Sequence, residues 1–349
     1  MNALRPLRVG VDEARRIACE LLEAAGADAD HARCTADSLL YADRSGVASH
    51  GLLRLPLYVA AAEQGGINVD PAMRWLPTRE GAGLLEADGA FGQVAMTEAL
   101  RYAREQLAGR AVVVVAVQGS SHYGAGAYWT DQLALDGYIG LCTSTTGPVV
   151  APHGAARAVL GTNPFSLSAP ADEQSPLSID MATSTGAYGK VIAARNAGDP
   201  LPEGWAVDSR GNPTTDPEAA MSGALTAFGG HKGSALAVGL EALSVVLGRS
   251  GFAFETQDIW ANPASRMNVG HTLVVIDPEA FTGLSHTRER VSELRRTVRA
   301  AGEDVLAPGD REAAARAQHR EHIMLAASTV HQIQECAAAR GVSPITTVN

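Results

Sequence analysis

The chain has 349 residues, of which 46% are hydrophobic and 19% are charged, a composition typical of a protein that buries a large core. Its 28 lysines and arginines against 38 aspartates and glutamates leave a net charge of −10, which argues against nucleic-acid binding through a basic stripe. The longest apolar runs, such as 111–117, fall well short of the roughly 20 residues of a membrane helix, and the pattern predicts no signal peptide. The four cysteines are scattered and form no CxxC pair, so we expect a reduced chain in the cytoplasm.

Helical periodicity dominates the first part of the chain. Apolar residues at helical spacing predict helices over 11–25 and 29–43, followed by a third over 57–64 that ends at two glycines. We therefore expect 1–75 to form a helical N-terminal segment.

After about residue 80 the pattern changes to helices alternating with short apolar strands. Helices are predicted over 93–107 and 234–247, and strands over 111–117, 138–143, 164–169, 177–181 and 271–276. From 285 the chain is rich in arginine, glutamate and alanine, which predicts helix to 339 with a break at 307–309. The pattern indicates a mixed α/β centre flanked by helical ends.

Several common nucleotide-binding and catalytic motifs do not occur. Gly124-Ala125-Gly126 follows a predicted strand and opens a helix, but Trp129 stands at the third glycine position of the Rossmann fingerprint. In His231-Lys232-Gly233-Ser234 the lysine precedes the glycine, unlike in a P-loop. There is no HExxH or GxSxG, and His319 and His322 are predicted to be solvated in a charged helix, so we expect no metal site and no nucleophile elbow.

One short segment combines residue types suited to acid–base chemistry on a carboxylate. If the chain is helical here, His50, Arg54 and Tyr58 lie on one face. An imidazole exchanges protons near neutral pH, and a guanidinium binds a carboxylate with two hydrogen bonds. Ser49 is placed to orient the imidazole. The alternative is an N-capping serine beside a surface histidine.

Four further loops combine polar side chains with turn residues. His122 follows a predicted buried strand, where clefts of α/β proteins form. Gly229–Ser234 precedes an apolar helix, whose free N–H groups together with Lys232 suit a phosphate. Asp180 ends another strand, and Gly161-Thr162-Asn163-Pro164 is a rigid turn whose hydroxyl and amide suit a ligand. For the histidine and for the glycine loop, a purely structural role is the alternative.

Taken in chain order, six motifs resemble those of the malate/L-lactate dehydrogenase family, an enzyme family that binds nicotinamide cofactors without a Rossmann fold. The resemblance covers about residues 10–315. It implies an α/β fold with a non-Rossmann nicotinamide-binding mixed-sheet domain (76–284), flanked by helical segments at 1–75 and 285–349. The motifs are Ser49-His50-Gly51 with Arg54, Ser121-His122-Tyr123-Gly124, Gly161-Thr162-Asn163-Pro164, Asp180-Met181-Ala182-Thr183-Ser184, Pro213-Thr214-Thr215-Asp216-Pro217 and Gly229-Gly230-His231-Lys232-Gly233.

The resemblance also implies roles for individual residues. His50 would donate the proton with Ser49 as its partner, Arg54 would bind the substrate carboxylate, and Thr162 would contact the substrate. His122 is a second catalytic candidate, because the matching residue is the acid/base in hydroxy-acid relatives. The family is homodimeric with its active site near the subunit interface, so we expect a homodimer acting on a small carboxylate.

The same resemblance assigns a set of residues to the nicotinamide cofactor. Lys232 and Arg311 in this set are suited to an added phosphate, so we expect NADPH in preference to NADH, with NADH as the alternative. The set comprises His122, Tyr123, Gly124, Ala125, Gly126, Asp180, Met181, Ala182, Tyr188, Gly189, Gly229, Gly230, His231, Lys232, Gly233, Ser234, Ala235, Pro308, Gly309 and Arg311.

Two branches of the family are represented in the motifs. The stretches 152–155, 192–204 and 229–236 are similar to cyclic-imine reductases, whereas 122–128 is similar to hydroxy-acid dehydrogenases. We predict reduction of Δ1-piperideine-2-carboxylate and Δ1-pyrroline-2-carboxylate to L-pipecolate and L-proline, by hydride transfer to C2 and proton donation from His50. The alternative is a 2-hydroxy acid dehydrogenase of the malate, L-lactate or ureidoglycolate type.

Overall fold

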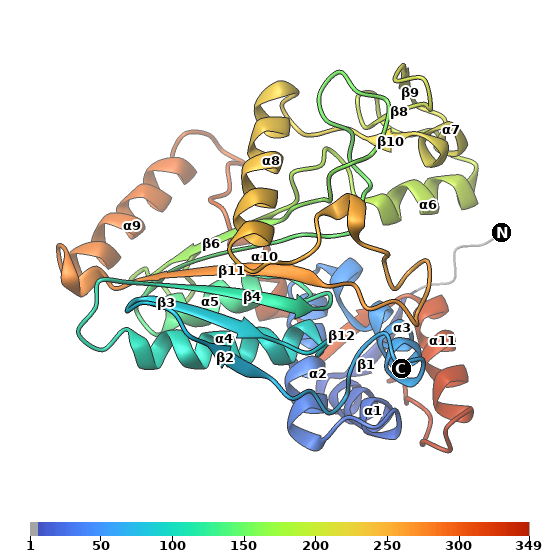
Figure 1. Ribbon diagram of the computed structural model, residues 1–349, viewed down its shortest axis with the longest axis horizontal. Coiled ribbons are helices and arrows are strands. Elements are labelled where there is room, and N and C mark those ends of the chain that lie inside the picture. The colour runs from blue at the N-terminus through green and yellow to red at the C-terminus, as the bar shows by residue number, and fades with distance from the viewer. Residues whose placement is uncertain (1–5, 349) are drawn as a thin grey trace.

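A seven-stranded mixed sheet forms the centre of the protein, as the computed structural model shows for residues 6–348 (Figure 1). The strands lie in the order β2, β3, β4, β11, β5, β6 and β7. Only β3 and β4 run parallel, and all other neighbours are antiparallel. The strands are β2 (Arg74–Leu76), β3 (Ala82–Glu86), β4 (Val112–Ser120), β5 (Ile139–Ser144), β6 (Phe165–Ala169), β7 (Leu177–Met181) and β11 (Val269–Ile276).

The place of β11 decides the fold class. It pairs antiparallel with both β4 and β5, so these two consecutive strands are not neighbours in the sheet. A Rossmann domain instead needs parallel neighbours joined by crossover helices. The prediction of a non-Rossmann mixed α/β fold is therefore confirmed.

Helices cover both faces of the sheet. α4 (Gly92–Gln106) and α5 (Gly126–Leu135) pack on one face, and α8 (His231–Val246) packs on the other (Figure 1). α4 and α8 are the helices that the sequence predicts over 93–107 and 234–247. The short loop between β4 and α5 brings His122 to the end of the central strand β4.

The N- and C-terminal parts of the chain pack together beside the sheet (Figure 1). The N-terminal helices α1 and α2 match the sequence prediction and share the main hydrophobic core with the sheet. β1 pairs antiparallel with β12. The elements are β1 (Leu7–Gly10), α1 (Val11–Ala24), α2 (Ala29–Arg44), α3 (Leu55–Glu63), α10 (Asp310–Gln318), β12 (His322–Leu325) and α11 (Ala327–Ala338). α9 (Leu284–Arg299) lies apart from them, against β7 at the other end of the sheet (Figure 1).

The composition predicts a helix through this region, and this prediction is wrong at His322–Leu325, which form strand β12. In the strand, Ile323 and Leu325 are buried and alternate with less buried neighbours, a period of two. Four residues are too few for that period to stand out in a helix-rich sequence. The strand forms because Val9 of β1, more than 300 residues earlier, is its partner opposite Ile323.

A smaller lobe with its own hydrophobic core lies at one end of the sheet (Figure 1). The lobe contains α6 (Tyr188–Ala197), α7 (Pro217–Ser222) and a three-stranded sheet of β8 (Ala206–Val207), β9 (Pro213–Thr214) and β10 (Ala224–Leu225). The sequence predicts only turns from 196 onwards here, because strands of two residues carry no periodic signal.

No helix among the described residues is long and apolar enough to cross a membrane.

Candidate active site

The segment that carries the first candidate residues is not one helix. It consists of two 3-10 turns, η1 (Ala48–His50) and η2 (Leu52–Arg54), separated by an extended Gly51 before α3 begins. The single helical face assumed for His50, Arg54 and Tyr58 is therefore absent. The three side chains still meet at one place. His122 contacts both His50 and Tyr58, and Trp260 contacts both His122 and Arg54.

A buried carboxylate holds these two turns in place. Asp43 near the end of α2 accepts a hydrogen bond from the backbone N–H of Leu52 at 2.8 Å. A Cβ on Gly51 would overlap the Asp43 carboxylate, so only glycine allows the turn to pack this closely. Burial raises the pKa of Asp43 from 3.8 to about 7, partly offset by the hydrogen bond from Leu52.

Asp43→Asn is expected to remove a pH dependence of stability. The pKa of Asp43 is higher in the folded protein than in the unfolded chain, so between about pH 4 and pH 7 the folded protein binds more protons. This contribution to stability falls as the pH rises through that window, by at most about 4 kcal/mol. The asparagine variant keeps the acceptor for Leu52 and carries no charge. Urea unfolding at pH 4.5 and 7.5 measures the free energy of unfolding of both proteins. Relative to the wild type, the variant should be more stable at pH 7.5 than at pH 4.5. The same difference in stability at both pH values would contradict the raised pKa of Asp43.

Two histidines from different elements lie side by side in the site. The rings of His50 and His122 are stacked with centroids 5.6 Å apart, and Ser49 Oγ lies 3.0 Å from His50 Nδ1. Burial, together with the positive charge of Arg54, lowers the pKa of His50 to about 4. Burial and the neighbouring His50 and Arg54 lower the pKa of His122 well below its ordinary value. Both imidazoles are therefore neutral at pH 7 in the free protein.

A hydrogen-bonded chain links Gln93 and Tyr58 to one ring nitrogen of His122. Gln93 Nε2 donates to the Tyr58 hydroxyl at 3.2 Å, and this hydroxyl lies 2.6 Å from His122 Nδ1. The Tyr58 hydroxyl has two lone pairs and one proton, so it can accept from Gln93 and still share a hydrogen bond with His122 Nδ1. This contact fixes the orientation of the His122 ring through Nδ1.

Tyr58→Phe is expected to lower kcat roughly 10-fold, about 1.4 kcal/mol in the transition state, because the His122 ring is no longer held in place through Nδ1. Steady-state kinetics on the purified variant measures this effect. Tyr102→Phe is the matched control, since Tyr102 also donates one hydroxyl hydrogen bond, to the carbonyl of Ala82 at 3.0 Å. Equal kcat in both variants would show that Tyr58 has only a structural role.

Arg54 lies beside the histidines with its terminal nitrogens unused. Its Nε donates to the carbonyl oxygen of Ser49 at 2.7 Å, and its guanidinium carbon lies 4.4 Å from the centre of the Trp260 indole. Within residues 6–348, neither terminal nitrogen hydrogen-bonds to another residue, and no carboxylate lies within ion-pair distance. A half-buried guanidinium of this kind is suited to an anionic ligand.

Trp260 is a site residue that the sequence analysis missed. Besides stacking on Arg54, its indole meets the His122 ring edge-on at 5.1 Å. It lies in the irregular segment between η3 (Ala253–Glu255) and β11, which has no periodic pattern and no motif. A lone tryptophan in a loop carries no signal that could have found it.

Thr162 belongs to a turn that is fixed by other buried groups. Its backbone N–H donates to Thr146 Oγ1 at 3.0 Å, and its carbonyl oxygen accepts from Thr183 Oγ1 at 2.8 Å. The next residue, Asn163, donates to the buried carboxylate of Glu241 at 2.7 Å. Within the described residues, no hydrogen bond links Thr162 directly to the histidine pair, and its role as a substrate contact stays a prediction.

Two of the segments predicted to bind the cofactor meet at the start of α5. The loop 122–126 leads into this helix, and Asp180 at the end of β7 lies against it. The Asp180 carboxylate accepts hydrogen bonds from Ser166 Oγ at 2.5 Å and from the backbone N–H of Ala127 at 2.9 Å. The neighbouring Met181 and Ala182 are exposed.

The glycine-rich loop 229–235 lies at the start of α8. Ser234 Oγ accepts a hydrogen bond from the backbone N–H of His153 at 3.0 Å, which joins this loop to the stretch 152–155. The structure therefore brings together two of the stretches that resemble cyclic-imine reductases, 152–155 and 229–236. Lys232 is exposed and forms no hydrogen bond or ion pair within residues 6–348.

The remaining cofactor candidates come from two other elements. Pro308 accepts a hydrogen bond from the backbone N–H of Ser178 at 3.4 Å, so Pro308-Gly309 lies beside β7. Tyr188 and Gly189 begin α6 in the smaller lobe. Arg311 on α10 is exposed and has no hydrogen-bond or ion-pair partner in the described part of the chain.

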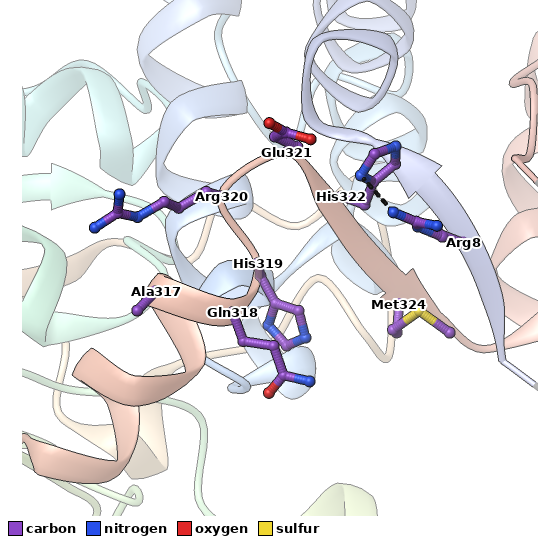
Figure 2. Close-up of a pocket in the computed structure, with 8 residues that line it drawn as sticks. All are labelled: Arg8, Ala317, Gln318, His319, Arg320, Glu321, His322 and Met324. Atoms are coloured by element: carbon purple, nitrogen blue, oxygen red, sulfur yellow. Dashed lines mark hydrogen bonds between the residues drawn. The ribbon is translucent and has the colours of Figure 1, made fainter.

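A cavity of about 410 Å³ opens elsewhere, between α10 and the β1–β12 pair (Figure 2). None of the predicted site residues lines it. The sequence predicts His322 in a helix, but it lies in β12 on the wall of this cavity. Its Nδ1 is 3.0 Å from Arg8 Nη2. His319 follows the end of α10, with Nδ1 3.2 Å from the carbonyl oxygen of Arg44. Residues 6–348 contain no group of three histidine, cysteine, aspartate or glutamate side chains that could hold a metal ion.

The arrangement can bind a small carboxylate at Arg54 and exchange a proton with it through a neighbouring histidine. These are the requirements of an acid–base enzyme that acts on a carbon next to a carboxylate. The profile of the family described as malate/L-lactate dehydrogenase matches residues 9–334 of the chain.

Characterised relatives cover most of the chain. It is 33% identical over 330 residues to the malate/(S)-sulfolactate dehydrogenase of Methanothermus fervidus, covering 94% of this chain and 97% of that protein. It is 34% identical to the (2R)-3-sulfolactate dehydrogenase (NADP(+)) of Chromohalobacter salexigens, covering 95% and 98%. It is 35% identical to the ureidoglycolate dehydrogenase (NAD(+)) of Escherichia coli K12, covering 79% and 78%.

Solved structures share the whole fold. The sulfolactate dehydrogenase of Methanocaldococcus jannaschii superposes with a TM-score of 0.90 at 29% identity, covering 97% of this chain and 98% of that one. The Δ1-piperideine-2-carboxylate reductase of Pseudomonas syringae pv. tomato superposes with a TM-score of 0.87 at 31% identity, covering 94% and 99%. The chain therefore belongs to the malate/L-lactate dehydrogenase family, and it is an NAD(P)-dependent oxidoreductase.

Proposed function

We propose that this protein reduces the cyclic imino acids Δ1-piperideine-2-carboxylate and Δ1-pyrroline-2-carboxylate to L-pipecolate and L-proline. The observation that carries the proposal is the half-buried Arg54, whose terminal nitrogens have no partner within residues 6–348 and lie beside two neutral histidines and the apolar face of Trp260. This combination suits a compact ligand with one carboxylate, one protonatable nitrogen and an otherwise apolar ring. Similarity to the Pseudomonas syringae reductase supports it.

Binding of the carboxylate prepares the proton donor. In the free protein the charge of Arg54 contributes to the low pKa of His50. A carboxylate bound to the terminal nitrogens of Arg54 offsets that charge and so raises the pKa of His50. The Ser49 hydroxyl, 3.0 Å from His50 Nδ1, holds the ring while its other nitrogen faces the ligand. Once the carboxylate is bound, His50 takes up one proton from solvent. As the C=N double bond becomes single, the His50 imidazolium transfers this proton to the substrate nitrogen and returns to its neutral form.

The glycine-rich loop fits a nicotinamide cofactor. Gly229 and Gly230 have φ angles of 59° and 62°, and a Cβ on Gly229 would meet no atom within 4 Å, so the backbone is open to a ligand. The loop leads into the start of α8, where unpaired N–H groups favour an anionic pyrophosphate. When bound, the reduced cofactor supplies the hydride for C2 of the substrate.

NADPH is the preferred cofactor in this proposal. Lys232 and Arg311 are exposed cations with no competing ion pair in residues 6–348, which leaves them available to an added phosphate. The relatives include both an NADP(+) and an NAD(+) enzyme. Titration of the protein with each reduced cofactor measures the preference, and tighter binding of NADH would overturn it.

A substrate panel tests the reaction itself. The values of kcat/KM are compared for the two cyclic imines, pyruvate, oxaloacetate and ureidoglycolate, with cofactor absorbance as the readout. Both rings should be used with a modest preference, because one methylene is worth only about 1–3 kcal/mol in a hydrophobic pocket. A clear preference for a 2-oxo or 2-hydroxy acid favours the alternative, a malate-, lactate- or ureidoglycolate-type dehydrogenase, which the stretch 122–128 and the named relatives support.

We also propose that the protein is a homodimer with the site near the subunit interface. One face of α8 packs on the sheet, while its opposite face exposes a run of apolar side chains that a second subunit would bury. The same helix begins at the glycine-rich loop. Light scattering should give twice the 36.2 kDa mass of one chain, and Leu243→Asp should lower it. The exposed side chains are Leu236, Val238, Leu243, Val246 and Leu247.

The four free thiols support the cytoplasmic location that the sequence predicts.

A further inference from the structure

We propose that Trp260 determines substrate specificity, as the apolar wall of the site and as the support for the carboxylate-binding Arg54. The inference rests on the proposed function in so far as Arg54 binds a carboxylate. Its first basis is the contact geometry: the indole lies over the face of the guanidinium at 4.4 Å and meets the His122 ring edge-on at 5.1 Å.

Stacking on the face of Arg54 leaves its edge free. A guanidinium forms hydrogen bonds in its own plane, so an aromatic ring over the face does not compete with a carboxylate at the edge. Nε is already used by the carbonyl of Ser49, which leaves the two terminal nitrogens for the ligand. Trp260 and Ser49 together therefore fix the direction from which the carboxylate is bound.

The loop that carries Trp260 is anchored on both sides of the indole. Ile259 is completely buried in the main core. The Asp258 carboxylate accepts a hydrogen bond from the backbone N–H of Trp260 at 3.1 Å, and its own backbone carbonyl accepts from Ala261 at 3.0 Å and Asn262 at 3.1 Å. The tryptophan side chain itself is 41% exposed. An indole held in place by its loop but left open to solvent offers an apolar surface next to otherwise polar groups.

This surface favours substrates that carry methylene groups beyond the carboxylate-bearing carbon. Contact with the indole contributes in proportion to the apolar area covered, so a five- or six-membered ring gains more than pyruvate. A hydroxyl or second carboxylate against the same surface would lose hydrogen bonds to water without replacement. The chemical class selected is a monocarboxylate with an apolar remainder.

The test compares Trp260→Ala, Trp260→Phe and Phe254→Ala across substrates of increasing apolar size. Phe254 is the matched control, since it is an exposed aromatic residue that precedes the same loop and stacks on Phe252 instead of on the site. With Trp260→Ala, KM for Δ1-piperideine-2-carboxylate should rise about 10-fold more than KM for pyruvate, with a smaller change in kcat. Trp260→Phe should keep most of the wild-type preference for Δ1-piperideine-2-carboxylate over pyruvate. Phe254→Ala should have the KM values of the wild type.

A series of 2-oxo acids separates this inference from the proposed function. If the wild type does not reduce the cyclic imines, the proposed function fails. The role of Trp260 then stands if Trp260→Ala removes the preference among pyruvate, 2-oxobutyrate and 2-oxopentanoate. An equal change of KM for every substrate would overturn the specificity role, and a variant indistinguishable from Phe254→Ala would overturn the inference as a whole.

Discussion

Replacing Arg54 with lysine is expected to lower kcat/KM about 100-fold, close to 3 kcal/mol at about 1.4 kcal/mol per tenfold. Lysine keeps the positive charge but loses the planar pair of terminal donors, the hydrogen bond to the Ser49 carbonyl and the flat stacking on Trp260. The rise in KM should be accompanied by a fall in kcat, because a loosely held carboxylate also misplaces the reacting carbon.

Arg316→Lys is the matched control for this variant. Arg316 also lies over an aromatic ring, with its guanidinium carbon 5.2 Å from the centre of Tyr41, but it belongs to α10 and pairs with Asp131. This control should reduce stability without changing KM. If Arg54→Lys retains the kinetics of the wild type, Arg54 does not bind the substrate carboxylate.

The second large effect is expected for His50→Asn, with a loss of about 10²–10⁴-fold in kcat. Asparagine preserves a polar side chain beside Ser49 but cannot transfer a proton. His122→Asn distinguishes the two catalytic candidates, since the residue that donates the proton should show the larger loss. His331→Asn on the exposed face of α11 serves as the control for histidine replacement.

The measurement is single-turnover reduction with cofactor and substrate in excess of their dissociation constants, so that binding defects do not enter the rate. A larger loss in His122→Asn would transfer the proton-donor role to His122 and leave His50 as its stacked neighbour at 5.6 Å. Wild-type rates in both variants would contradict acid–base catalysis by either histidine.

Local sequence patterns determined much of the fold. The valine run of β4 predicts a strand buried on both faces. The periodic apolar residues of α2 and α4 and the long apolar stretch of α8 predict helices close to their observed bounds. These elements are long or strongly periodic, so short-range physics specifies them. The motif around Ser49, His50 and Arg54 likewise pointed to a carboxylate and a proton donor, because its chemistry lies within six residues of sequence.

Only the tertiary structure decided which distant elements meet. β11 enters the sheet between β4 and β5, and β12 pairs with β1, through contacts that no local period records. The same holds for the site. Asp43 packs against Gly51 and hydrogen-bonds to the next residue, and Trp260, in a loop some 200 residues further along the chain, stacks on Arg54. A buried carboxylate and a stacked indole are recognisable only by what surrounds them, since burial and ring contact depend on long-range packing rather than on neighbours in the chain.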